Sequence, residues 1–399
     1  MAQIDKIFDS LSSNNLFENK FVLQTSYTPE NIPHRDKQIE QVASILAPAL
    51  RGEKTSNLFL YGQTGTGKTL SIKYVRDKMM NRAKTNNIPL KIQYLNCKLK
   101  KVSDTEYRIL ADLIKKLGGS VPATGLPTEH VYNKFIDMVE QEKKLLILIL
   151  DEIDYAVKKM SDGFLYNLTR LNSELVSSQI SLIGISNDLK FLDSLDPRVR
   201  SSLSEEEIVF SPYNAIQLQE ILSERSKIAF KKDVLEEGVL SKCAAYAARE
   251  HGDARRALDL LRIAGELAER EGLKKVSIRH VDMANEKIDK DKFVEVIEAA
   301  PKQFQLALLS IINLSENTKE KIFTGDVYNF YHDLCNKIGI EVLTQRRISD
   351  IIAEIDMLGL INARVISKGR HGRTREIKLA IPSKALGKIK TLLHEKLEL

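Results

Sequence analysis

The chain has 399 residues and a formal net charge of +6, with 43% hydrophobic and 29% charged residues. This length allows two or three domains, and the composition fits an ordinary soluble globular protein. Three widely spaced cysteines, Cys97, Cys243 and Cys335, argue against a disulfide framework and make no zinc pattern. No apolar run approaches membrane-spanning length, and residues 1–19 are too acidic and polar for a signal peptide. We therefore expect a cytoplasmic protein with no membrane partner.

A glycine-rich loop between a predicted strand and a predicted helix is the most informative segment. The apolar run at residues 57–61 predicts a buried strand, and residues 70–80 predict a helix. The loop between them fits the phosphate-binding pattern and consists of Gly62, Gln63, Thr64, Gly65, Thr66, Gly67, Lys68 and Thr69. Its glycines let backbone N–H groups turn toward a phosphate, Lys68 can reach the terminal phosphates, and Thr69 can hold Mg²⁺. The alternative, a turn that binds nothing, is disfavoured by this flanking strand and helix.

Polar residues at the ends of two further predicted strands extend this site. Residues 145–150 are all apolar, as in a strand buried on both faces, and Asp151 and Glu152 follow. An acid at such a strand end lies where open α/β sheets bind ligands, so Asp151 would hold Mg²⁺ and Glu152 would orient or activate water. Residues 180–185 predict a third strand, after which Asn187 could contact the γ-phosphate or the water, although Asn-Asp there also suits a plain turn.

Two arginine-bearing segments follow these strands. Arg198 and Arg200 come after a turn and either face solvent or act as a finger in the site of a neighbouring subunit. Asp253 is expected to cap a helix, which places Arg255 in the first turn, where the helix dipole disfavours a cation. Arg255 therefore has either a phosphate partner or an ordinary salt bridge.

From residue 301 onward the pattern changes to short helices and a hairpin. Helices are expected at residues 302–314, at 324–338 with Thr324 as a cap, and at 345–358 with Thr344 as a cap. Strands are expected at residues 360–367 and 375–381. Three helices followed by a hairpin predict a winged helix, whose third helix enters the major groove of DNA.

Charge in this region indicates a nucleic-acid interface. Residues 362–390 contain nine Lys or Arg against one acid, and such an excess repels itself without an anionic partner. Arg346 and Arg347 begin the third helix, where they contact bases or only phosphates. The other candidate DNA-binding residues lie at the hairpin tip: Lys368, Arg370, His371, Arg373 and Arg375. The alternative is a solvated charged hairpin.

With these segments in order, the chain resembles AAA+ ATPases, and more narrowly the archaeal replication initiators related to the origin recognition complex and its partner helicase loader. The similarity extends from about Tyr27 to the C-terminus. Its most specific segments are YTPENIPHR from Tyr27, GQTGTGKT from Gly62, LILDEID from Leu148, SNDLKFLDSLDPRVRSSL from Ser186 and HGDARRALDLLR from His251.

The resemblance implies roles for individual residues. Asn187 matches the first sensor and Arg255 the second, while Pro33 and Arg35 match the stretch that borders the adenine. Related clamp-loading ATPases carry Ser-Arg-Cys where this chain has Ser201-Ser202-Leu203, so neither Arg198 nor Arg200 is singled out as a finger. Family members also carry a helical insertion that touches DNA. Residues 98–131 either match that insertion or form a surface loop between helices.

The expected fold is therefore α/β: a parallel-sheet AAA+ P-loop ATPase core, a helical lid and a C-terminal winged helix. The expected boundaries are an N-terminal arm at residues 1–26, the core at 27–212, the lid at 213–289 and the winged-helix domain at 290–399.

The resemblance implies an ATP-dependent DNA replication initiator that uses ATP/ADP and Mg²⁺ and hydrolyses ATP slowly, as a switch. Its implied partners are double-stranded origin DNA, the replicative minichromosome-maintenance helicase and paralogous initiator subunits, and its expected location is at the nucleoid.

The residues alone leave two alternative functions open. One is a nucleotide-gated transcription regulator with a helix-turn-helix, although no sensory repeat region is evident. The other is a clamp-loader-type ATPase, which the basic hairpin disfavours.

Overall fold

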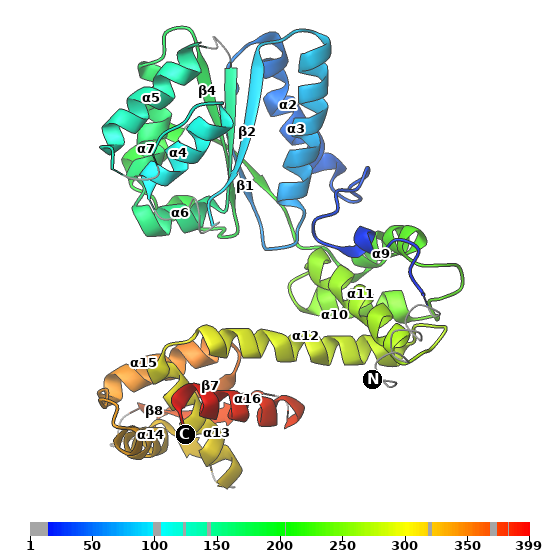
Figure 1. Ribbon diagram of the computed structural model, residues 1–399, viewed down its shortest axis with the longest axis vertical. Helices are drawn as coiled ribbons and strands as arrows, with labels where there is room; N and C mark the ends of the chain where they lie inside the picture. The colour runs from blue at the N-terminus through cyan, green and yellow to red at the C-terminus, as the bar shows by residue number, and fades with distance from the viewer. Residues whose placement is uncertain are drawn as a thin grey trace. The chain divides into compact units, whose positions relative to one another are not determined.

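The computed structural model describes residues 15–98, 105–122, 125–141, 145–203, 205–317, 321–367, 373–381 and 383–399. Contacts divide the chain into two compact units, Met1–Val281 and Asp282–Leu399 (Figure 1). Among the described residues, none of the helices combines the length and the apolar character needed to cross a membrane.

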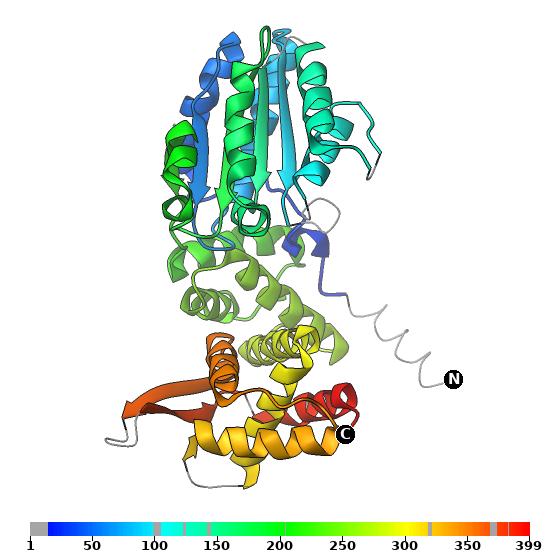
Figure 2. The same cartoon turned by 90° about the vertical axis from the view of Figure 1, so that its left-hand side faces the viewer.

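A five-stranded parallel sheet forms the centre of the first unit. Its strands are β1 (Asn57–Tyr61), β2 (Leu90–Asn96), β3 (Leu145–Asp151), β4 (Gln179–Ser186) and β5 (Glu205–Val209). They pair in the order β2-β3-β4-β1-β5, every neighbouring pair is parallel, and Figure 2 shows them side by side. The parallel sheet and the three strands expected from the sequence are confirmed. The carboxyl ends of β1, β3 and β4 consequently meet at one edge of the sheet, the edge where open α/β sheets bind ligands.

Helices cover both faces of this sheet. The bounds are α2 (Asp36–Leu46), α3 (Lys68–Thr85), α4 (Glu106–Lys116), α5 (Thr128–Gln141), α6 (Ile153–Met160), α7 (Gly163–Arg170) and α8 (Pro197–Leu203). Figure 1 shows α2 and α3 on one face and α4 to α7 on the other. Alternate residues of β3 enter the two cores: Leu146, Leu148 and Leu150 pack with α4 to α7, while Ile147 and Ile149 pack with α2 and α3. Burial on both faces explains why this strand is a continuous apolar run.

The rest of the first unit is helical. It contains α9 (Ala215–Ala229), α10 (Val239–Arg249), α11 (Ala254–Arg270), and the 3-10 helices η1 (Lys20–Leu23), η2 (Ala47–Arg51), η3 (Leu171–Ser173) and η4 (Leu192–Ser194). The next helix, α12 (Ile278–Ala299), begins in this unit and continues into the second. It runs through residues 289–292, where the sequence suggests a domain boundary.

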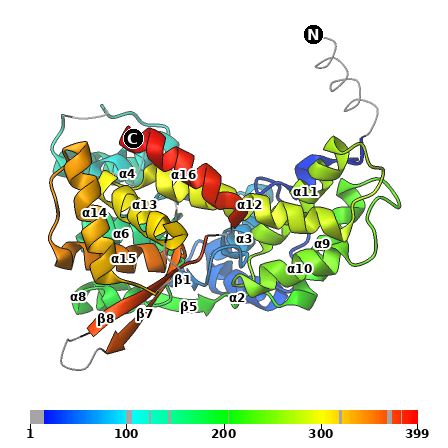
Figure 3. The ribbon, with the colours of Figure 1, turned by 90° about the horizontal axis from the view of Figure 1, so that it is seen from below.

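The described residues of the second unit form four more helices and a small antiparallel sheet. They are α13 (Lys302–Asn317), α14 (Thr324–Ile338), α15 (Gln345–Met357), α16 (Ser383–Leu397), β6 (Ile322–Phe323), β7 (Ile361–Ser367) and β8 (Arg373–Leu379). The strand order is β6-β8-β7, and Figure 3 shows β7 and β8 extending side by side. The three expected helices and the hairpin of the winged helix are therefore present.

Two details of this unit differ from the sequence-based expectation. Helix α16 was not expected, yet Ala385, Ile389 and Leu393 repeat every four residues and are buried in the core of this unit. The expected cap at Thr324 is wrong, because α14 begins with Thr324 itself. The N–H of the preceding Phe323 donates to Asp326, and the Thr324 hydroxyl instead accepts a hydrogen bond from the backbone N–H of Arg375 at 3.4 Å. The hydroxyl thus joins α14 to β8.

Candidate nucleotide site and nucleic-acid interface

The glycine-rich loop connects β1 to α3 at the carboxyl edge of the sheet, and two of its glycines allow close approaches. Gly62 has φ +149°, and a Cβ there would lie 2.4 Å from the carbonyl oxygen of Phe210. Gly65 has φ +73°, and a Cβ there would lie 1.6 Å from Asp253 Oδ1. A side chain at either position would therefore displace backbone or the end of α11, so the loop shape requires glycine.

Lys68 lies inside this loop and is buried. Its Nζ donates to the carbonyl oxygens of Gly62 at 2.6 Å and Gln63 at 2.9 Å, and to Asn187 Oδ1 at 3.0 Å. Burial lowers the pKa of Lys68 to about 8, against the attraction of Asp151. The Lys68 ammonium thus contacts the side chain of Asn187, the residue that follows β4, an arrangement consistent with a phosphate-binding lysine and a sensor.

Asp151 is the centre of a second set of contacts. Its Oδ2 accepts from the Thr69 hydroxyl at 2.9 Å and from the Tyr94 hydroxyl at 2.6 Å, while its Oδ1 accepts from the Glu152 N–H at 3.0 Å. Burial and the charge of Asp151 raise the pKa of Tyr94, so the phenol remains a donor. A buried carboxylate beside a hydroxyl offers oxygen ligands of the kind that bind a phosphate-bound Mg²⁺.

Glu152 occupies the turn between β3 and α6. Its φ of 56° and ψ of 44° are left-handed, a conformation that non-glycine residues adopt only uncommonly. Lys98 Nζ lies 3.3 Å from Glu152 Oε2. The carboxylate is therefore held at the sheet edge by a cation that the sequence analysis did not associate with it.

A cavity of about 440 Å³ lies over these groups. Its walls include most of the residues predicted for the nucleotide site: Pro33, Thr64, Gly65, Thr66, Gly67, Lys68, Thr69, Asp151, Glu152, Asn187 and Arg255. Arg255 belongs to the first turn of α11, and Asp253 caps that helix by accepting from the Arg255 and Arg256 N–H groups, as expected. The loop, both strand ends and the lid thus converge on one space, whose buried cation and oxygen ligands fit a Mg²⁺-bound nucleotide phosphate.

Five residues predicted for the nucleotide site do not line this cavity: Gly62 and Gln63, which belong to the glycine-rich loop, and Arg35, Arg198 and Arg200. Arg35 does not line the cavity: it is 3% exposed, donates to the carbonyl oxygens of Thr66 at 2.8 Å and Ser211 at 2.6 Å, and stacks on the Tyr213 ring. Burial lowers its pKa. Arg35 therefore supports the glycine-rich loop through a backbone carbonyl without lining the cavity. Arg198 and Arg200 are exposed on α8, also outside the cavity.

Several contributors were missed by sequence reasoning. Tyr94 lies in β2 and Lys98 lies two residues after the end of that strand, and the alternation of apolar and polar residues from Leu90 to Tyr94 was the available sequence signal for this strand. The lid contacts the loop directly, since the Ala254 N–H donates to the Gly65 carbonyl at 3.3 Å. Arg225 and Tyr27 also line the cavity, and the Arg225 guanidinium lies 4.6 Å from the Tyr27 ring centroid. No local pattern reveals these long-range pairs.

The N-terminal arm, described from residue 15 to residue 26, docks on the lid. Phe17 and Phe230 form a β-bridge, and their ring centroids lie 4.5 Å apart. The Glu18 N–H donates to the Ala229 carbonyl at 2.8 Å. Residues 24–29 then line the cavity. Residues 17–29 consequently connect the surface of the lid to the wall of the cavity.

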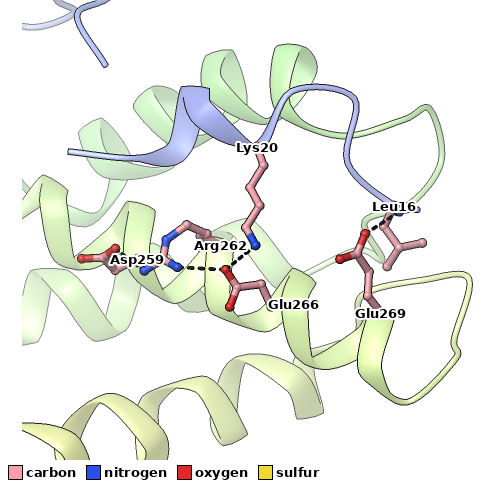
Figure 4. A network of polar contacts seen from close by, with 6 residues as sticks. All are labelled: Leu16, Lys20, Asp259, Arg262, Glu266 and Glu269. Carbon is pink, nitrogen blue, oxygen red and sulfur yellow. Dashed lines mark hydrogen bonds and ion pairs between the residues drawn. The ribbon is translucent and has the colours of Figure 1, made fainter. Parts of the chain in front are cut away.

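Charged groups on α11 fix this arm (Figure 4). Lys20 Nζ lies 2.7 Å from Glu266 Oε1, which also accepts from Arg262 Nη1 at 2.9 Å. The Leu16 N–H donates to Glu269 Oε1 at 2.8 Å. Burial raises the pKa of Glu266, but the hydrogen bonds and charges of Lys20 and Arg262 outweigh burial, so the pKa lies below its ordinary value.

Glu266→Gln is therefore expected to loosen the arm by about 1 kcal/mol, the scale of a partly exposed ion pair. The lowered pKa of Glu266 contributes stability that is present above the unfolded pKa of about 4.3 and is lost as the pH falls through the lower folded value, so wild-type arm protection should also decline once the pH is below that unfolded pKa. Hydrogen-exchange protection factors of residues 16–23, measured at neutral and acidic pH, test both effects. Glu237→Gln, on the exposed lid surface, is the control. Equal arm protection in Glu266→Gln and wild type would contradict the assignment.

The second unit has a groove of about 690 Å³ where α14, α15 and the hairpin meet. Arg346 and Arg375 line it, and Arg347 is exposed beside it in the first turn of α15. Thr344 caps this helix, as expected. Arg375 Nη1 donates to the Ser349 carbonyl at 2.5 Å and so ties β8 to α15. Lys368, Arg370 and His371 lie outside the described residues, as does the side chain of Arg373.

Comparison with protein families matches three parts of the chain. Residues 51–191 match an AAA domain, residues 219–286 the Cdc6 AAA+ ATPase-type lid domain, and residues 295–388 the CDC6 C terminal winged helix domain. The expected combination of a parallel-sheet AAA+ core, a helical lid and a C-terminal winged helix is thereby confirmed.

Individual relatives cover nearly the whole chain. The "ORC1-type DNA replication protein" of Thermococcus onnurineus is 52% identical over 383 residues, which cover 95% of this chain and 92% of the relative. The "ORC1-type DNA replication protein 1" of Archaeoglobus fulgidus is 51% identical, with 96% and 92% covered. The Aeropyrum pernix ORC1 protein, solved in complex with DNA, matches with a TM-score of 0.84 and 43% identity over 95% of this chain and 97% of its own. The chain therefore belongs to the family of ORC1-type DNA replication initiators, AAA+ ATPases that end in a winged helix.

Proposed function

We propose that this protein is an ATP-dependent initiator that binds double-stranded origin DNA and helps recruit the replicative minichromosome-maintenance helicase. Paralogous initiator subunits are its other partners. The observation that carries the proposal is the convergence of Lys68, Asn187 and the Thr69–Asp151 pair on one cavity, in a chain that also carries a winged helix. The DNA-bound A. pernix ORC1 protein supports the DNA partner.

The proposed nucleotide chemistry uses residues at the cavity wall. Lys68 and the backbone N–H groups of residues 62–68 bind the phosphates of ATP or ADP. Thr69 and Asp151 would hold Mg²⁺, which would neutralise phosphate charge when bound. Glu152 accepts the proton of the attacking water, and Asn187 orients it. Arg255 reads the γ-phosphate from the lid, and Pro33 borders the base.

Slow, switch-like hydrolysis is part of the proposal. Lys98 Nζ lies 3.3 Å from Glu152 Oε2, so this cation would compete with the attacking water for the carboxylate. Arg198 and Arg200 do not reach the cavity of their own chain, and Arg200 Nη1 lies 3.1 Å from Asp193 Oδ1. One of these arginines would complete the site only in a neighbouring subunit, so turnover would depend on assembly.

The remaining assignments concern the rest of the chain. We assign residues 1–26 to the arm, 27–212 to the core, 213–289 to the lid and 290–399 to the DNA-binding domain. Residues 98–131, which include α4, would contact DNA from the core. Two contact points on one duplex would bend it, so DNA shape would contribute to specificity.

A footprint on chromosomal fragments, with and without ATP, tests the function. Protection at a replication origin supports the initiator. Protection at scattered promoters would instead support the alternative, a nucleotide-gated transcription regulator.

Replacing both Arg346 and Arg347 with Ala is expected to weaken duplex binding and to reduce the slope of log affinity against log salt by about 2. If both arginines contact phosphates, the loss of each one means that about one counterion fewer is released from the DNA on binding. Fluorescence anisotropy over a salt series measures the slope. Arg51→Ala, which removes an arginine paired with Glu53 in the first unit, is the control. An unchanged affinity together with an unchanged slope would place the DNA interface elsewhere.

A further inference from the structure

The Tyr94 hydroxyl contacts one of the proposed Mg²⁺ ligands and has no role in the proposed function. It donates to Asp151 Oδ2 at 2.6 Å, a shorter distance than the 2.9 Å of the Thr69 hydroxyl to the same oxygen. Tyr94 also lines the cavity. Short O–H···O⁻ hydrogen bonds to a carboxylate are among the stronger hydrogen bonds in proteins.

The register of the sheet explains how this tyrosine reaches the acid. Strand β2 pairs with β3 so that Tyr94 lies opposite Ile149 and Asn96 lies opposite Asp151. Tyr94 and Ile149 both pack on the core that contains α3. Asp151 is two residues after Ile149 in β3 and therefore lies on the same face of the sheet as Tyr94. A long side chain at that position spans the diagonal to the carboxylate.

The hydrogen bonds of Asp151 leave little freedom for its carboxylate. A carboxylate has about four acceptor positions. Thr69 and Tyr94 occupy both positions on Oδ2, and the Glu152 N–H occupies one on Oδ1. About one position remains, on Oδ1. Such an arrangement holds the carboxylate in one orientation and leaves it able to accept from one water of a hydrated metal ion.

We propose that Tyr94 is a positioning residue that fixes the Asp151 carboxylate for Mg²⁺ and thereby sets the Mg²⁺ affinity of the nucleotide complex. This inference rests on the proposed nucleotide site. Groups that orient a ligand in this way typically change metal affinity 10- to 100-fold when they are removed.

Tyr94→Phe separates this role from packing. The phenyl ring would stay beneath Lys73, whose Nζ lies 4.5 Å from the ring centroid, and the backbone carbonyl would still accept from Lys116 Nζ at 2.7 Å. Only the hydroxyl is lost. Tyr74→Phe is the matched control, because Tyr74 also lies beneath a cation, Lys78 at 5.4 Å, but does not line the cavity.

The test titrates Mg²⁺ into each full-length variant in the presence of a fluorescent ADP analogue, after an initial measurement in EDTA. Direct Mn²⁺ binding to the ADP complex, followed by electron paramagnetic resonance, gives a readout that does not depend on turnover. For Tyr94→Phe we expect ADP affinity in EDTA within twofold of wild type and a Mg²⁺ midpoint raised about tenfold. Tyr74→Phe should match wild type in both measurements.

The outcomes separate the inference from the proposed function. A Mg²⁺ midpoint within twofold of wild type for Tyr94→Phe overturns the inference while leaving the nucleotide site intact. An equal loss of affinity in EDTA and in Mg²⁺ also overturns it, because the hydroxyl would then serve packing alone. If wild type and Asp151→Asn show the same Mg²⁺ dependence, the proposed metal ligands themselves are wrong, and the inference fails with them.

Discussion

Lys68→Ala is expected to lower the affinity for ATP and ADP at least 100-fold, to the point where binding is no longer detected at micromolar nucleotide. The ammonium lies where the terminal phosphates would bind, with three acceptors around it. Losing charge-assisted hydrogen bonds to a phosphate costs about 3 kcal/mol, which corresponds to that factor. Isothermal titration calorimetry with ADP and with a non-hydrolysable ATP analogue measures the loss.

The same substitution should leave the fold intact. Burial lowers the pKa of Lys68 to about 8, so the charged form is disfavoured in the empty protein and its removal relieves that cost. Unfolding of Lys68→Ala without nucleotide should therefore resemble wild type, while the stabilisation by nucleotide disappears. Lys78→Ala, at an exposed position of the same helix, is the control and should keep both properties. Binding at wild-type strength would remove Lys68 from the site.

The parts of this site that sequence predicted are those encoded by local patterns. The glycines of residues 62–67 and the apolar run before Asp151 each have a local physical cause, namely a tight loop and a strand buried on both faces. The order of strands then brings Lys68 and Asn187 within 3.0 Å, although they are 119 residues apart. Parallel strands place their carboxyl ends at one edge, so this convergence was inferable without coordinates.

The parts that were missed depend on side-chain direction and on partners far away in the chain. Arg35 was expected beside the base, but its guanidinium turns behind the loop to carbonyl oxygens of residues 66 and 211. Leu16 meets Glu269 across 253 residues. The Thr324 hydroxyl could cap its helix or bond to β8, and only the packing of β8 decides between them. A pattern of residue types carries no information on such choices.

Glu152→Gln is expected to retain ATP but to lower single-turnover hydrolysis by about 100-fold or more, the usual contribution of a positioned general base. The side chain lies at the cavity wall, at the end of β3 and one residue after Asp151. Glutamine keeps its shape and length but cannot accept the proton of the attacking water. The Asp151 contacts with Thr69 and Tyr94 do not involve the Glu152 side chain, so the metal ligands should be undisturbed.

Because the wild-type rate is expected to be slow, the assay follows labelled ATP prebound at one equivalent of protein and quenched over hours. Bound nucleotide is quantified in the same samples, so that a lost rate is not confused with lost binding. Glu129→Gln, in the exposed first turn of α5, controls for the change in charge. If hydrolysis ends the ATP-bound state on DNA, the ATP-bound form of Glu152→Gln should persist on DNA longer than that of wild type. Hydrolysis at the wild-type rate would show that another group activates the water, and the left-handed turn at Glu152 would serve only to start α6.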